Sequence, residues 1–363
     1  MKKALIIIFI IAVASGIFYY LKYFYASDKV DLWDLVPKNA IGVYETEKPI
    51  KIWNSLLELP IWKNLSSIPA INDVNEDLVQ LDSITGSSGN MEKLFRDRPI
   101  LISLHKISNT DFGLTFYFTL NSGEKRKILN TILEHFKNLE PYKYDIRKYE
   151  DFSINELMND EGEVEFTFIE YKGHFIGSFT SFLIDDVIRN ISEGFQANFR
   201  TISNEIFNAQ PIEMDEGNMY LNVAKIPDLL RNFSSGEQRK DYDDYLKWFT
   251  GATYYDISFE DNRIFFNGST KIPENSNEFY LSTFYNQSPQ NIEAIYFLPN
   301  RTSTFISYTY EDFTDWRKAV DVYWEKNFPQ ALENKTELLK KYDIYERDFY
   351  GWIGNEIGLA TLQ

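Results

Sequence analysis

The chain has 363 residues, no cysteine and a formal net charge of −17 at pH 7. The lack of cysteine excludes both a disulfide framework and a lipid-modified cysteine, so stability has to come from ordinary packing. The acidity excludes a broadly basic surface of the kind that binds nucleic acid or anionic lipid.

Residues 4–21 (ALIIIFIIAVASGIFYYL) form an uncharged apolar run near the N-terminus. As a helix, this run would span about 27 Å, close to the thickness of the hydrocarbon core of a bilayer. Lys2 and Lys3 precede it, and the positive-inside tendency then places the N-terminus in the cytoplasm. We therefore expect residues 1–25 to be a single-pass anchor in the cell membrane, and the body to be periplasmic or otherwise extracytoplasmic.

A cleaved secretory signal is the alternative interpretation of the same run. Ala12-Val13-Ala14 offers small residues for cleavage, but the new N-terminus would still be strongly apolar. A cut after Ala26 would place the bulky Phe24 where a small residue is preferred. Both interpretations export the chain, and we prefer the uncleaved signal-anchor.

Residues 26–35 form a short polar linker. The first 27 residues hold three of the 37 basic residues and none of the 54 acidic ones, so the exported part has a net charge of −20. We interpret this acidity as a solubilising surface, and we expect no nucleic acid partner.

The first predicted elements are a strand and two helices. Residues 36–39 carry a turn signal, residues 40–45 form a strand, and Pro49 and Pro60 open two successive helices. From residue 100 the hydrophobic period changes to two, which predicts a hairpin over residues 100–120.

Apolar residues at helical spacing over 128–136 predict a helix after this hairpin, and the same order of hairpin and then helix returns twice further along. The elements are a hairpin at 163–180 with a helix at 182–191, a strand at 219–223, a helix at 226–233, and a hairpin at 252–270 with a helix at 276–285. Because hairpins dominate over βαβ crossovers, we expect an α+β fold. Antiparallel sheets would be built from hairpin-then-helix modules, with the helices mainly on one face.

An internal repeat divides the exported body. Residues 35–39 and the strand after them are echoed by residues 297–301 and a strand at 302–308, and each copy leads into helices with two tryptophans. A strand at 357–362 closes the second copy. We therefore predict an α+β ectodomain over residues 36–295. Residues 296–363 would be a second, incomplete copy of the strand-helix-helix-strand unit.

Two explanations of that incompleteness stay open. Either the last strand completes the first sheet, or the chain is a piece of a longer protein with two full repeats. We prefer the second, because an unpaired terminal strand leaves backbone groups exposed.

Candidate catalytic groups are few. Gly86-Ser87-Ser88-Gly89 lacks the strand-to-helix elbow of a nucleophilic serine, and the acidic pairs 150–151 and 185–186 are sequence neighbours whose side chains point apart. We interpret these pairs as solvated surface. Three histidines lack the spacing of metal ligands: His105, His135 and His174. We therefore assign no catalytic, cofactor-binding or metal site, and we predict that the protein is not an enzyme.

Four helical tryptophans are interpreted as core residues rather than as a ligand platform: Trp53, Trp62, Trp316 and Trp324.

Several motifs recur in an order that resembles a known family. They are Val36-Pro37-Lys38-Asn39-Ala40 with the tryptophans after it, Phe266-Asn267-Gly268-Ser269-Thr270, Asn286-Gln287-Ser288-Pro289 and Phe297-Leu298-Pro299. Over most of residues 35–330 the chain resembles the uncharacterised bacterial domain of unknown function family 3352. That resemblance implies a bacterial envelope protein with an N-terminal membrane segment and an exported body, and it carries no catalytic residues.

The leading functional hypothesis is a non-catalytic, membrane-anchored, extracytoplasmic protein that binds or scaffolds another envelope protein. An ectodomain that binds a glycan or an apolar small molecule is the alternative, suggested by an aromatic content of 17%. A deep pocket lined by aromatic side chains would favour that alternative, and a solid core would count against it. A hydrolase, the third option, would need two carboxylates that converge in a cleft.

Overall fold

The computed structural model describes residues 30–67, 72, 75–76, 98–108, 111–120, 143–202, 216–230, 251–260, 262–272 and 279–362. The described residues fall into two compact units: residues 30–230 with 252–269, and residue 251 with 270–362. The predicted boundary between residues 295 and 296 lies inside the second unit.

The predicted anchor, residues 4–21, lies outside the described residues. Among the helices that the structure does describe, none is both long enough and apolar enough to cross a membrane.

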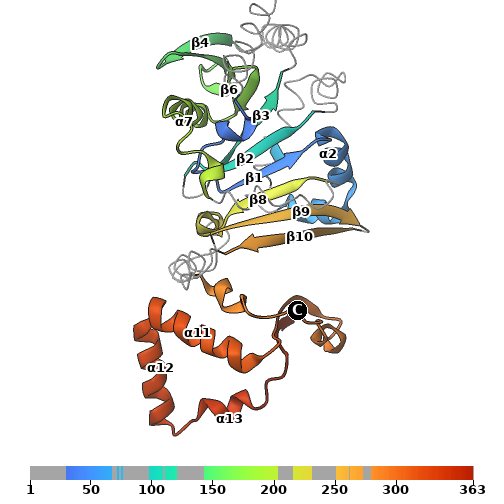
Figure 1. Cartoon of the computed structure of the whole chain (residues 1–363). Coiled ribbons are helices and arrows are strands. Elements are labelled where there is room, and N and C mark those ends of the chain that lie inside the picture. Colours follow the sequence, from blue (N-terminus) through green and yellow to red (C-terminus); the bar gives the residue numbers. More distant parts are fainter. Residues whose placement is uncertain are drawn as a thin grey trace, which may run out of the picture. The chain divides into compact units, whose positions relative to one another are not determined.

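The first unit is built on a ten-stranded antiparallel sheet, with the order β10-β9-β8-β1-β2-β3-β7-β6-β5-β4 (Figure 1). Its strands are β1 (Gly42–Thr46), β2 (Ile100–Lys106), β3 (Phe112–Thr119), β4 (Lys143–Tyr149), β5 (Phe152–Met158), β6 (Val164–Tyr171), β7 (His174–Ser178), β8 (Asn218–Asn222), β9 (Ala252–Glu260) and β10 (Arg263–Lys271). The expected α+β class with antiparallel strands is confirmed.

The predicted hairpins correspond to β2–β3, β6–β7 and β9–β10. The turn between β6 and β7 is formed by Lys172 and Gly173, both with positive φ, as a two-residue hairpin loop requires. The β4–β5 hairpin was not predicted. Its first strand, Lys143–Tyr149, lies at the edge of the sheet, is largely exposed and carries charges at alternate positions, so it lacks the apolar face that marks a buried strand.

Helices lie against both faces of this sheet. On one face, α7 (Ser181–Ser192) packs Ile184 and Val187 into a cluster that includes Leu101. On the other, α2 (Pro49–Glu58) places Ile50 against a cluster that includes Ile100. The prediction of helices mainly on one face is therefore wrong. The central strands carry apolar side chains on both faces of the sheet, so helices have to bury both faces.

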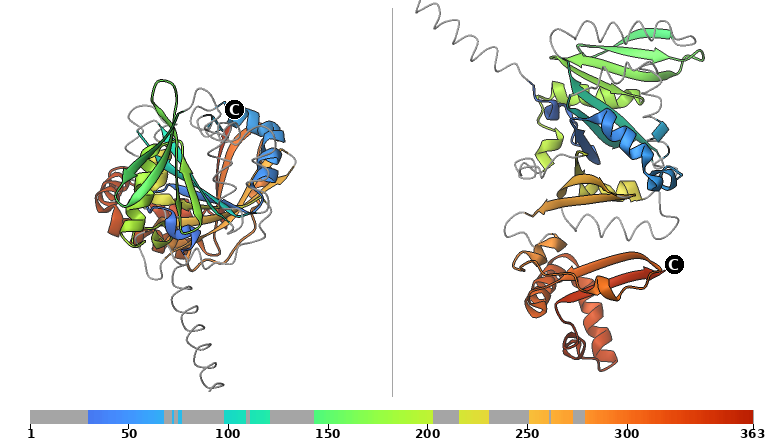
Figure 2. Two further views of the ribbon diagram at one scale, coloured as in Figure 1. Left: turned by 90° about the horizontal axis from the view of Figure 1, so that it is seen from above. Right: turned by 90° about the vertical axis from the view of Figure 1, so that its right-hand side faces the viewer.

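Shorter elements complete the first unit: η2 (Leu32–Leu35), α3 (Pro60–Leu65), η3 (Phe199–Ile202), η4 (Val223–Lys225) and α9 (Ile226–Leu230), where η marks a 3-10 helix. In the right-hand view of Figure 2, α2 and α3 (blue) lie across the face of the sheet opposite α7.

The second unit pairs two strands, β11 (Thr302–Thr309) and β12 (Glu356–Leu362), in an antiparallel sheet. Its helices are η5 (Tyr280–Phe284), η6 (Ala294–Phe297), α11 (Phe313–Asn327), α12 (Pro329–Lys341) and α13 (Glu346–Tyr350). Of the helix predicted at 276–285, the described part is the 3-10 helix η5. Trp316 lies in the core with Tyr310 and Val320, as predicted, and Trp324 packs against that core.

The two units share an order of elements. In the first, α2 and α3 lie between β1 and β2, which pair antiparallel. In the second, α11 and α12, with the additional α13, lie between β11 and β12, which also pair antiparallel. This is the order on which the predicted internal repeat was based.

Candidate functional site

An apolar cavity of about 420 Å³ lies inside the first unit, between the sheet and the α2–α3 segment. Its floor comes from the six neighbouring strands β10, β9, β8, β1, β2 and β3, and its roof comes from α2 and α3. A concave apolar space of this volume is typical of ligand pockets, so it is a candidate binding site.

Strand periodicity explains the floor. Side chains alternate between the two faces, so Ile102 and Leu104 of β2 line the cavity, while Leu101 enters the core under α7. Gly42 lies opposite Leu104 on one neighbouring strand and Leu221 on the other. A Cβ at Gly42 would lie 2.6 Å from Cδ2 of Leu221, so glycine leaves room here for that cavity-lining side chain.

The roof carries two aromatic side chains. Trp53 of α2 and Trp62 of α3 line the cavity, and their rings meet edge to face with centroids 6.3 Å apart. Of the α2 residues, Ile52 is buried, whereas Trp53 and Leu56 are only partly buried. The interpretation of Trp53 and Trp62 as core residues is therefore wrong, because the space beneath them is not filled by the sheet.

Polar side-chain groups in the lining are few, and both hydroxyl groups are engaged within the protein. The Tyr44 hydroxyl donates to the backbone oxygen of Glu216, and burial raises the pKa of Tyr44 above its ordinary value. The Thr46 hydroxyl accepts from the backbone N–H of Lys48 at 3.1 Å and also hydrogen-bonds the Tyr44 side chain. The cavity wall is therefore suited to apolar groups.

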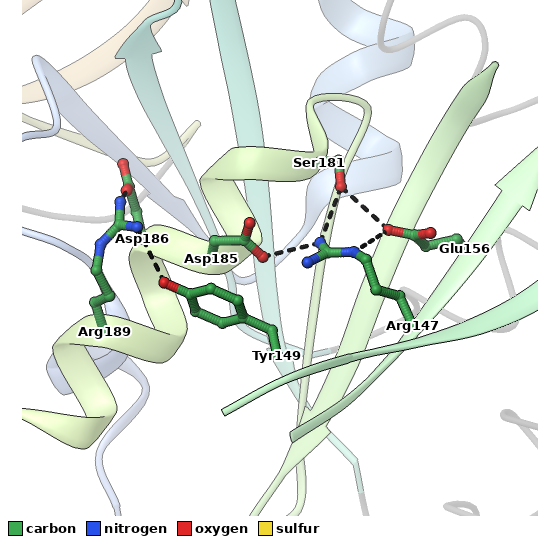
Figure 3. A network of polar contacts seen from close by, with 7 residues as sticks. All are labelled: Arg147, Tyr149, Glu156, Ser181, Asp185, Asp186 and Arg189. Carbon is green, nitrogen blue, oxygen red and sulfur yellow. Dashed lines mark hydrogen bonds and ion pairs between the residues drawn. The ribbon is translucent and has the colours of Figure 1, made fainter. Parts of the chain in front are cut away.

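A polar network lies on the opposite face, between the β4–β5 hairpin and α7 (Figure 3). Nε of Arg147 donates to Oε1 of Glu156 at 2.6 Å, and Nη2 donates to Oδ1 of Asp185 at 2.9 Å. Ser181 also donates to Glu156. Because both carboxylates hold one guanidinium, the arrangement fastens an edge hairpin to a helix.

The acidic pair Asp185 and Asp186 was interpreted as solvated surface, and the structure corrects this. Asp185 pairs with Arg147, and Asp186 pairs with Arg189 and accepts from Asn39. The side chains of Asp185 and Asp186 are 19% and 13% exposed, so both carboxylates are largely covered.

Two of the three histidines are in the described residues, and both are buried. Nε2 of His105 lies 2.7 Å from Oγ of Ser103, which donates to the Tyr117 hydroxyl, and burial lowers the pKa of His105 to about 3. His174 contacts the backbone oxygen of Val30. His135 and residues 86–89 lie outside the described residues. Within the described ranges, no three potential metal ligands gather.

The second unit exposes two adjacent aromatic side chains on η6. Tyr296 is 85% exposed and Phe297 is 84% exposed. The residue that matches Phe297 in the predicted repeat is Leu35, which is fully buried in the first unit. The corresponding position of the repeat is therefore buried in the first unit and exposed in the second.

Comparisons with known proteins give little further guidance. No protein-family model matches the chain, and no curated protein matches it. Among solved structures, crystal form I of TP0453 is similar, with a TM-score of 0.35 and 10% identity over 68% of this chain and 81% of that one. A similarity at this level carries no argument about function.

Proposed function

We propose that the first unit binds an apolar small molecule in the cavity between its sheet and the α2–α3 segment. The observation that supports this most is that apolar side chains from six strands and two helices surround about 420 Å³ of open space. Ligand pockets typically measure about 300–1,000 Å³ and are mostly apolar. The lining favours an apolar ligand over a glycan, which would need several free hydrogen-bonding groups.

We propose a binding protein rather than an enzyme. Its tether would be the apolar run at residues 4–21, with the N-terminus cytoplasmic and the cavity on the extracytoplasmic side. The resemblance to family 3352 supports this proposed placement, because it implies an N-terminal membrane segment and an exported body.

The test measures binding of the neutral fluorescent probe N-phenyl-1-naphthylamine to the full chain, purified in nonionic detergent. Energy transfer from tryptophan to the probe separates binding to the protein from partition into micelles. Because Trp53 and Trp62 line the cavity, a bound probe should accept this energy efficiently.

Two neighbouring leucines provide matched variants. Leu56 lines the cavity, whereas Leu57 is 43% exposed and does not line it. Leu56→Trp should fill the space and weaken probe binding at least tenfold, and Leu57→Trp should bind like the wild type. Equal binding by both variants, with far-ultraviolet circular dichroism unchanged, would remove the cavity as the binding site.

A protein partner is the second candidate function, and the exposure of Tyr296 and Phe297 favours it. Contiguous exposed aromatic groups are enriched at protein interfaces. Crosslinking in the native membrane should then give a stoichiometric product that Tyr296→Ser with Phe297→Ser abolishes. Tyr342→Ser, at another exposed tyrosine, should leave it unchanged. A product that survives the double substitution would contradict an interface at η6.

A further inference from the structure

The chemistry of the cavity wall restricts what can be buried in it. Among the described lining residues, side-chain hydroxyls come from Tyr44 and Thr46, and both are hydrogen-bonded within the protein. Among the described residues, the indole N–H of Trp62 has no hydrogen-bond partner, and neighbouring protein atoms cover it. A polar ligand group placed here would lose its hydrogen bonds to water and regain few of them.

The shape of the cavity is a second restriction. Its floor crosses six neighbouring strands, and strands in a sheet are about 4.8 Å apart, so the lining extends over as much as about 24 Å. On each of these strands two or three residues of the same face line the cavity, so its floor is a broad apolar surface. A compact ring system would cover only part of this floor, whereas a flexible chain can extend across it.

We infer that the buried part of the ligand is a single flexible hydrocarbon chain, such as the acyl chain of a fatty acid or of a lipid, with its polar end outside the cavity. This inference rests on the proposed function and names the ligand class. The cavity volume of about 420 Å³ limits the length of chain that can be buried.

The test uses straight-chain carboxylic acids of about 8 to 18 carbons to displace N-phenyl-1-naphthylamine from the full chain, below their micelle concentrations. Each buried methylene should strengthen binding about fourfold, because its transfer free energy is about 0.8 kcal/mol. The gain should level off once further methylene groups no longer fit in the cavity.

Two comparisons separate this class from others. A hydroxyl in the middle of the chain should weaken binding at least tenfold relative to the unsubstituted acid, because both hydroxyl groups of the wall are already hydrogen-bonded within the protein. A monoacyl phosphocholine with the same chain should compete as well as the free acid if the source is a lipid. If free acids alone compete, the source is a free fatty acid.

The outcomes distinguish the inference from the proposed function. Binding that does not depend on chain length, or that tolerates the hydroxyl, overturns the hydrocarbon chain while the cavity remains a binding site. The hydrocarbon chain is also overturned if the fused-ring compound pyrene displaces the probe and the acids do not. The proposed function itself would be overturned if the wild-type chain bound no probe, or if Leu56→Trp left probe binding unchanged.

Discussion

The backbone N–H of Ile61 donates a hydrogen bond to the side-chain oxygen of Asn262, 2.6 Å away and 201 residues later in the chain. Ile61 is in the first turn of α3, where backbone N–H groups lack acceptors within the helix. Asn262 lies between β9 and β10 with a φ of 66°, a conformation that asparagine tolerates well. One end of the cavity roof is therefore fastened to a turn of the sheet.

Removing this contact should loosen the roof. Asn262→Gly keeps the positive φ without strain but has no side-chain acceptor. One hydrogen bond contributes about 1 kcal/mol, so the dissociation rate constant of N-phenyl-1-naphthylamine should rise about fivefold in stopped-flow measurements. Asn262→Asp keeps the acceptor and should release the probe at the wild-type rate. Equal rates for both variants would show that the contact does not hold the roof.

The guanidinium of Arg147 should contribute to stability through two ion pairs. The side chain of Glu156 is only 6% exposed, so Arg147→Met leaves a covered carboxylate without its cation. The variant should lose about 2 kcal/mol of unfolding free energy in urea titrations, and Arg147→Met with Glu156→Leu should regain most of it. Lys143→Met, at an exposed position on the same strand, should change stability by less than about 0.5 kcal/mol. A double variant as unstable as the single one would contradict this.

His105 should make stability depend on pH under acidic conditions. Its pKa is lowered from 6.5 to about 3 by burial. Between these values the unfolded chain binds a proton that the folded chain does not, so the free energy of unfolding falls as pH falls, at about 1.4 kcal/mol per pH unit. The measurement is the difference in unfolding free energy between wild type and His105→Gln from pH 7 to pH 4.

That difference isolates the histidine, because the carboxylates contribute equally to both proteins. It should shrink as the pH falls below 6.5, since only the wild type loses stability through His105. A difference that stays constant across this range would mean that the imidazole can be protonated in the folded protein.

Gly268 should not accept a side chain. A Cβ built there would lie 1.9 Å from the backbone oxygen of Tyr254, and a backbone atom cannot turn away as a flexible side chain can. Gly268→Ala should therefore cost about 2 kcal/mol or more in unfolding free energy, by displacing one strand of the β9–β10 pair. Gly354→Ala, where a Cβ would meet nothing within 4 Å, is the control and should be nearly neutral. If both variants are neutral, β10 is held less closely than described.

The local sequence pattern predicted many of the helices and strands, but it did not predict how closely they pack against one another. Strands with a buried apolar face, such as Ile100–Lys106, were predicted nearly to the residue because burial repeats every second side chain. The edge strand Lys143–Tyr149 was missed because it is exposed and carries no such repeat. Apolar periodicity in α2 indicated that Trp53 would be covered, yet it did not indicate how closely the sheet would approach.

By itself, the sequence determined the acidic, cysteine-free composition, the apolar N-terminal run, the hairpins and the antiparallel α+β class. Those features depend on neighbouring residues, whose pattern is visible along the chain. Only the tertiary structure decided that helices cover both faces and that a cavity remains beneath α2 and α3. Residues from Gly42 to Phe266 line that cavity. Their meeting depends on strand order and register, which bring distant segments together and which no local pattern encodes.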